Sequence, residues 1–191
     1  MMELAKQVGE QLGEDDGVIV IDPSAFPKQG KRSVGVARQW CGRLGKVDNC
    51  QVAIYMGYVS RKGHALVNRR LYLPREWTLD RARCKAAGIP RGVRFQTRHQ
   101  QGLEMLDEQG HLLPHAWLAG DDEMGRNARF RSDLHAAGER YLLAVPCDML
   151  IGVLDAEPPE YQGRGRIPKV PFQRVDRWRD SLSEDAWTPV D

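Results

Sequence analysis

The run Val18-Ile19-Val20-Ile21 constrains the fold most, because four consecutive β-branched aliphatic residues stand directly before Asp22 and Pro23. Such a run predicts a strand that is buried on both faces of a sheet. The proline predicts a turn after the strand. Since open α/β sheets hold their ligands at strand ends, Asp22 is the first candidate for a functional carboxylate. The alternative is a structural turn in which Asp22 accepts hydrogen bonds from local backbone donors.

The composition describes an ordinary globular chain. Its 191 residues suit one domain with an appendage, and 41% of them are hydrophobic. Neither a signal peptide nor an apolar run near the roughly 18 residues of a membrane span is present. The cysteines are Cys41, Cys50, Cys84 and Cys147, without a Cys-x-x-Cys pair, and the five histidines are scattered. We therefore expect free thiols, a cytoplasmic location and no zinc site.

The net charge of +2 conceals two oppositely charged segments. Residues 61–98 contain eleven basic and two acidic side chains, whereas residues 99–160 contain four basic and twelve acidic ones. This separation suits a protein that binds a polyanion through one segment and cations through the other. The alternative is a pair of solvated faces that partly neutralise each other.

The first half of the chain predicts a helix followed by three strands. Apolar residues at helical spacing indicate an amphipathic helix within residues 1–16, ended by Gly13, and residues 17–22 form the first strand. Glycines, prolines and cations punctuate residues 23–49, which predicts a long loop with a short turn of helix near residues 36–41. Alternating residues at 51–60 and 65–73 predict an antiparallel hairpin.

The second half predicts helices alternating with strands. After a charged segment at 74–90, we expect a helix at 96–109, a strand at 116–119, a helix at 127–137 and a strand at 141–145. Asn127 is a plausible N-cap of the second helix and Gly138 its stop. The predicted fold class is α/β, with a mixed five-stranded sheet flanked by helices.

The loop at 23–49 suits close approach to phosphate groups, because it combines glycines with cations. It lacks the Gly-x-x-x-x-Gly-Lys-Ser/Thr pattern of a nucleotide P-loop. Together with the basic segment, it supplies the residues that we predict to bind DNA: Lys28, Lys31, Arg32, Arg38, Arg61, Lys62, Arg69 and Arg70.

Asp121 is the predicted partner of Asp22. It follows the strand at 116–119, which can lie beside the first strand and so bring the two carboxylates together. Like charges at adjacent strand ends repel unless a cation lies between them. Mg²⁺ takes oxygen ligands and keeps waters or phosphate oxygens for the rest of its shell. The alternative is that Asp121 or Asp122 only caps the following helix.

These residues carry a resemblance to a known family. The runs are Val-Ile-Asp22-Pro-Ser-x-Phe-x-Lys-x-Gly, Leu-Tyr-Leu-Pro-Arg-Glu-Trp77, Ala-Gly-Ile-Pro90 and Trp117-Leu-Ala-Gly-Asp-Asp-Glu-Met-Gly125. They resemble the catalytic core of DDE-superfamily transposases and endonucleases of bacterial insertion sequences, which have an RNase H-like fold. The family's first two catalytic and metal-binding acids match Asp22 and Asp121, with Asp122 as the alternative register.

The resemblance implies phosphoryl transfer on DNA, with two Mg²⁺ ions, or Mn²⁺, held by a carboxylate triad. Transposon ends and target DNA are the implied partners. The family's third acid, a glutamate, lies on a helix beyond an inserted β-rich region, and no residue here occupies that context. We therefore expect a helical remnant at 1–16, a partial core at 17–150 and a truncated insertion at 151–191, with strand transfer weak or absent.

Two other functions stay open at this point. A catalytically silent fragment that binds DNA or a full-length transposase requires only the basic segment and an intact sheet. A haloacid-dehalogenase-like phosphatase also begins with a strand that ends in Asp, but it has a second Asp two residues later, where this chain has Ser24.

Overall fold

The computed structural model describes residues 1–153, 156–166 and 169–188. The chain divides into two compact units, Met1–Ala144 and Val145–Asp191, which are treated separately below. Among the described residues, no helix has the length and apolar character that crossing a membrane requires.

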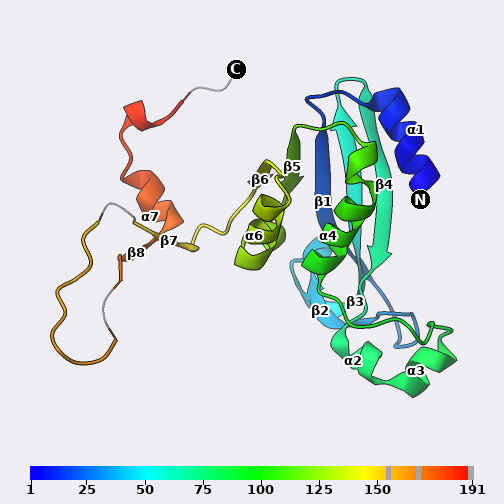
Figure 1. Ribbon diagram of the computed structural model, residues 1–191. Helices are drawn as coiled ribbons and strands as arrows, with labels where there is room; N and C mark the ends of the chain where they lie inside the picture. Colours follow the sequence, from blue (N-terminus) through cyan, green and yellow to red (C-terminus); the bar gives the residue numbers. More distant parts are fainter. Residues whose placement is uncertain (154–155, 167–168, 189–191) are drawn as a thin grey trace. The chain divides into compact units, whose positions relative to one another are not determined.

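The first unit is built on a mixed six-stranded sheet (Figure 1). The strands are β1 (Val18–Pro27), β2 (Ala37–Cys41), β3 (Lys46–Ser60), β4 (Gly63–Leu71), β5 (Trp117–Gly120) and β6 (Tyr141–Leu143). Antiparallel β3 and parallel β5 flank β1, and β6 continues the sheet beyond β5. The length of β3 lets β2 and β4 pair in succession along its other edge. The mixed α/β class is thus confirmed, with one strand more than predicted.

The extra strand comes from the segment predicted as a loop, and that prediction was wrong. β1 does not end at Asp22 but continues to Pro27, paired with β3 throughout. β5 pairs with β1 only as far as Ile21, so one edge of β1 is unpaired beyond that residue, and prolines are tolerated at such an edge. β2 replaces the predicted turn of helix. It alternates buried Ala37 and Cys41 with exposed Arg38. The 3₁₀ turn Gly42–Leu44 then reverses the chain through Gly45, whose φ of 62° favours glycine.

The core lies on one face of this sheet. Helix α4 (Arg98–Gln109) packs there, with Gly102 against Ile21, and helix α1 (Met2–Leu12) packs on β3 and β4. Ile19 and Ile21 are both fully buried in this core. Val18 and Val20 are only half-buried, so the predicted burial of β1 on both faces was wrong. On the other face, Val20 and Leu66 line an open apolar cavity of about 540 Å³.

The helices predicted around the sheet are confirmed. Thr97 begins α4 with a capping box, and Asn127 caps α6 (Ala128–Ala136), which is followed by Gly138 with a φ of 77°. The segment at 74–90 contains two short helices, α2 (Arg75–Leu79) and α3 (Arg81–Ala86). The remaining elements of the unit are the 3₁₀ turn η2 (Gly110–Leu112) and the single-turn helix α5 (Asp122–Gly125).

The thiols are free, as predicted, and three of the four are buried. Cys41 and Cys50 are fully buried beside Val52. Burial, followed by the neighbouring Cys41, raises the pKa of the Cys50 thiol to about 11. Both cysteines therefore act as small apolar residues of a second core cluster.

The second unit is smaller. β7 (Leu150–Gly152) pairs antiparallel with β8 (Phe172–Arg174), which leads directly into α7 (Val175–Asp180) and then the 3₁₀ turn η3 (Glu184–Ala186). The backbone amides of Val175 and Asp176 donate to the carbonyls of Met149 and Cys147, which fastens α7 to the strand pair.

Candidate acidic metal site

Asp22 and Asp121 come together where β5 leaves β1. The parallel register pairs Ile21 with Gly120, so the residues that follow on the two strands are the two aspartates. Both line one cavity of about 350 Å³, together with Glu123. The predicted approach of two carboxylates, 99 positions apart in the chain, is therefore what the sheet topology produces.

The turn after β5 distinguishes Asp121 from Asp122. Asp121 is the N-cap of α5, and its Oδ1 accepts a hydrogen bond from the Met124 amide at 3.2 Å. Asp122 instead accepts from Arg126 Nη2 at 2.7 Å and does not line the cavity. Asp121 therefore caps α5, as the alternative interpretation predicted, and also lines the cavity beside Asp22.

Close backbone packing holds this turn in place. A Cβ atom at Gly125 would lie 1.8 Å from the carbonyl oxygen of Ala144, directly after β6. At Gly120 it would lie 2.9 Å from the Leu143 side chain. Only glycine fits at Gly125 without a backbone shift, so the residue type fixes the distance between α5 and the sheet.

Three carboxylates and two guanidinium groups, those of Arg43 and Arg98, set the electrostatics of the cavity. Partial desolvation raises the pKa of Asp22, and the charges of Asp121 and Glu123 raise it further. Two clustered carboxylates with an open side are the donors that Mg²⁺ and Mn²⁺ prefer. The acid pair therefore fits a divalent cation, whose charge would reverse the repulsion. Among the described residues, no group of three or more His, Cys, Asp or Glu is arranged to hold a metal ion.

Arg98 and His99, at the start of α4, anchor the helix that carries the third cavity carboxylate. Arg98 Nη1 donates to Glu123 Oε1 at 2.5 Å, and His99 Nε2 lies 3.0 Å from the Glu123 carbonyl oxygen. Arg98 also donates to Gln39 on β2 at 3.3 Å. Sequence reasoning missed both Arg98 and Glu123. The run Asp121-Asp122-Glu123 was the available signal, because residues two apart around a helix start can face one cavity.

The family model for DDE superfamily endonucleases matches residues 2–191. The chain belongs to this family. No match was found among curated proteins or among solved structures. Members of this superfamily use divalent metal ions and act on DNA, which agrees with the charge and donor set of the acid pair.

The cations predicted to contact DNA do not form one patch in this chain. Lys28, Lys31 and Arg32 follow β1, and Arg38 lies on β2. Arg61 and Lys62 lie in the β3–β4 turn, beyond the start of β1. There, Arg61 pairs with Asp16 at 2.7 Å and Lys62 donates to the Gly13 carbonyl oxygen at 2.8 Å.

The last two predicted cations lie on β4. Arg69 is exposed, whereas Arg70 pairs with Glu104 and Glu108 of α4 at 2.6 and 2.5 Å. Two cations outside the predicted set, Arg43 and Arg98, line the acid cavity itself. Arg43 belonged to the segment predicted as a loop, and its place beside Asp22 follows from the strand pairing of β2.

Proposed function

We propose that Asp22 and Asp121 bind Mg²⁺ or Mn²⁺ at a site for phosphoryl transfer on DNA, the reaction by which strands are cleaved and transferred at transposon ends and target DNA. We expect this activity to be weak or absent in this chain, because no residue occupies the context of the family's third acid. The observation that carries the proposal is the shared cavity of the two aspartates, where burial, followed by the charges of Asp121 and Glu123, raises the pKa of Asp22. Membership of the DDE superfamily endonucleases supplies the reaction class.

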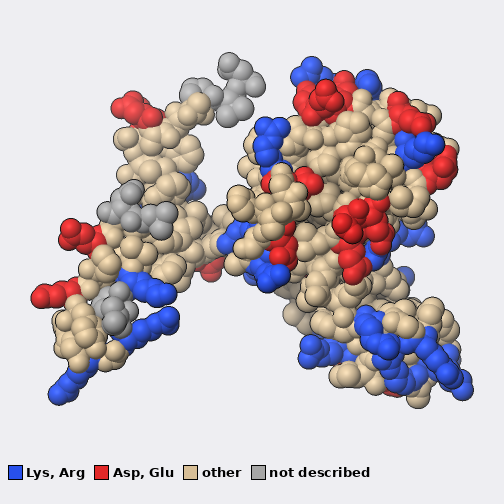
Figure 2. All heavy atoms as spheres, in the orientation of Figure 1, with Lys and Arg blue, Asp and Glu red and all other residues tan. Residues whose placement is uncertain are grey.

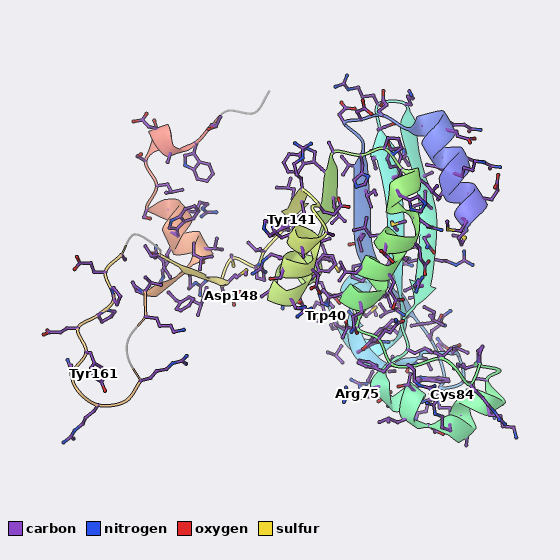
Figure 3. All side chains as sticks on the ribbon, viewed as in Figure 1. Trp40, Arg75, Cys84, Tyr141, Asp148 and Tyr161 are labelled. Carbon is purple, nitrogen blue, oxygen red and sulfur yellow. The ribbon has the colours of Figure 1, made fainter. Side chains whose placement is uncertain are left out.

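The side chains of the cavity have distinct roles in this proposal. Divalent ions, when bound, activate a water or 3′-hydroxyl nucleophile and stabilise the leaving oxygen. Asp22 and Asp121 act as ionised ligands, not as proton shuttles. Arg43, at the same cavity, can pair with a phosphodiester. Trp40 of β2 is 53% exposed at the cavity and offers a ring on which a base can stack (Figure 3).

The predicted DNA contacts fall into two groups within this proposal. Lys28, Lys31, Arg32 and Arg38 lie on the segment that leads from β1 into β2, and Arg38 shares β2 with Trp40. We assign these four to the DNA backbone near the acid cavity. Arg61, Lys62, Arg69 and Arg70 are assigned to more distant contacts, for which Arg61 and Arg70 would exchange their carboxylate partners for phosphate.

Titration calorimetry with Mg²⁺ and Mn²⁺ tests the metal assignment. Asp22→Asn and Asp121→Asn should each weaken binding at least tenfold, because each removes one of two anionic ligands. Asp122→Asn is the matched control, since it removes a neighbouring carboxylate that pairs with Arg126, and it should bind metal like the wild type. Unchanged affinity in both site variants would contradict the proposal.

Nicking of supercoiled DNA in Mn²⁺ separates the proposed reaction from the alternative function. Cleavage that Asp22→Asn abolishes and Asp122→Asn retains would support phosphoryl transfer by this chain. DNA binding without cleavage in any variant would favour the alternative, a silent chain that binds DNA or a full-length transposase and modulates transposition.

A further inference from the structure

A third cavity lies in the α2–α3 lobe, by which we mean residues 75–94, beyond the end of the sheet (Figure 1). The lobe is firmly attached to the first unit. Trp77 is 1% exposed, and its indole Nε1 donates to the Val36 carbonyl oxygen at 2.8 Å. Arg83 stacks on the Trp77 ring at 3.6 Å and donates to the Lys31 carbonyl oxygen at 2.9 Å. The cavity therefore belongs to an ordered structure.

Cations surround this cavity of about 640 Å³. Its walls are α3 and the turn that follows, and its lining includes four exposed basic side chains, Arg81, Lys85, Arg91 and Arg94. Buried Cys84 and the half-buried Ile89 contribute apolar surface. Figure 2 shows the Lys and Arg side chains gathered over this lobe, and Figure 3 places Cys84 within it.

The four cations lack the carboxylate partners that neutralise other cations of the chain. Within the described residues, none of the four forms an ion pair, whereas Arg70, Arg98 and Arg126 each do. Arg94 Nη1 donates to the Arg91 carbonyl oxygen at 2.8 Å and Arg81 Nη1 to the Val93 carbonyl oxygen at 3.5 Å. These contacts orient the guanidinium groups and leave their charge uncompensated.

A cation–aromatic stack connects the lobe with the acid cavity. Arg75, at the start of α2, lies over the Phe95 ring at 5.0 Å, and Phe95 meets Tyr72 edge-on at 6.3 Å. Arg98 covers the Tyr72 ring at 4.9 Å and pairs with Glu123 at the acid cavity. The two cavities therefore belong to one packed structure.

We propose that the α3 cavity is a phosphate-binding subsite for the DNA backbone, separate from the acid pair. This inference rests on the proposed function, because the superfamily's DNA substrate is the polyanion that it assigns to the cavity. Clustered cations without carboxylates repel one another, and a phosphodiester chain relieves this repulsion while gaining charge-assisted hydrogen bonds. The concave shape lets several cations face the same one or two phosphates.

The decisive variant is Lys85→Gln/Arg91→Gln, since within the described residues neither side chain makes a hydrogen bond or ion pair whose removal would disturb the fold. Fluorescence anisotropy with a labelled 30-base-pair duplex, at several salt concentrations, measures binding by the full chain. We expect affinity in about 50 mM salt to fall tenfold or more. The slope of log affinity against log salt should decrease by about 0.9 for each phosphate that the variant no longer neutralises.

The matched control, Lys6→Gln/Arg129→Gln, removes two exposed charges from α1 and α6 and should change affinity less than threefold. Unchanged affinity and slope in the cavity variant, or an equal decrease in the control, would overturn the inference. Tight calorimetric binding of free adenosine monophosphate, with normal DNA affinity in the cavity variant, would also overturn it. A free nucleotide would then be the ligand.

Metal binding distinguishes the two proposals. If the cavity variant binds DNA normally while Asp22→Asn loses metal binding, the subsite fails and the proposed function stands. If the cavity variant loses DNA affinity while both aspartate variants bind metal normally, the subsite stands and the metal assignment fails. The cavity variant itself should bind Mn²⁺ with wild-type affinity, because its substitutions lie outside the acid cavity.

Discussion

The acid cavity and the α2–α3 lobe differ in how the chain assembles them. Asp22 and Asp121 meet only because β1 and β5 pair in parallel, with a glycine-dependent turn behind them. The lobe's cations are close in sequence, between Arg81 and Arg94, and lie on one short helix and the turn that follows it. The two aspartates therefore meet only through long-range strand pairing, whereas the cations come from a single segment, which long-range contacts of Trp77 and Arg83 attach to the rest of the unit.

Replacing a glycine beside the acid cavity should have the largest effect on stability. In Gly125→Ala, the new Cβ would lie 1.8 Å from the Ala144 carbonyl oxygen, so the turn that holds Asp121 must shift. We expect a loss of about 3 kcal/mol, which corresponds to a fall in Tm of roughly 6–12 °C. Thermal unfolding followed by circular dichroism provides the measurement.

The control for this experiment is Gly92→Ala, because a Cβ at Gly92 in the lobe meets no atom within 4 Å and its φ is not positive. Its Tm should stay within about 2 °C of the wild type. A Gly125→Ala variant as stable as Gly92→Ala would show that the acid cavity does not depend on this packing.

The two cavities also differ in how far their residues were predictable. The apolar run before Asp22 and the acids after residues 116–119 predicted that these two carboxylates lie together, because an apolar strand pattern followed by a carboxylate is a local signal. The continuation of β1 past Asp22 to Pro27 had no such signal. The strand β2 was missed, since glycines around Ala37–Cys41 obscured an alternation that becomes clear only beside β3. Arg43 and Trp40 were missed as cavity residues for the same reason.

The lobe presents the opposite case. The sequence showed that residues 61–98 are rich in cations, but not which of these cations surround a cavity. Arg61 and Arg70 belong to the same segment, yet carboxylates from distant parts of the chain neutralise them. Which cations retain uncompensated charge depends on tertiary pairing. The attachment of Trp77 to Val36 likewise joins parts of the chain 41 positions apart and has no local signal.

Cation replacements test this difference between paired and uncompensated charges. Arg98 is largely buried, with a side chain 16% exposed, and it pairs with Glu123. Arg98→Gln leaves that carboxylate unpaired beside Asp22 and Asp121, so we expect a loss of about 1–3 kcal/mol in metal-free protein, measured by urea unfolding at pH 7. Lys85→Gln, in the lobe, should change stability by less than about 0.5 kcal/mol. Equal effects of the two substitutions would remove the distinction.

Added Mg²⁺ distinguishes two reasons for a loss of stability in Arg98→Gln. If the loss of stability comes from three uncompensated carboxylates, saturating Mg²⁺ should restore part of the stability of this variant by binding the folded state. If Arg98 contributes only through packing on the Tyr72 ring, Mg²⁺ should stabilise the wild type and the variant equally.

The smallest expected effect concerns the charge of Asp22 itself. Its pKa is raised in the folded protein, so the folded state holds this proton to a higher pH than the unfolded chain does. The stabilisation from the bound proton is complete below the unfolded pKa near 3.8 and is lost as the pH rises through the folded pKa. Asp22→Asn cannot ionise and avoids that loss.

Without metal, the Tm of Asp22→Asn should therefore match the wild type near pH 3 and exceed it by about 1–3 °C at pH 7, because the partly exposed carboxylate is screened by solvent. Mg²⁺ should reverse the order at pH 7, since it stabilises only a chain that retains both ligands. A wild type that stays more stable than Asp22→Asn at pH 7 without metal would mean that neither burial nor the neighbouring carboxylates, Asp121 and Glu123, disfavour ionised Asp22 in the folded state. The electrostatic argument for a cation between Asp22 and Asp121 would then fail, whereas the proposal for the cationic cavity of the lobe would still stand.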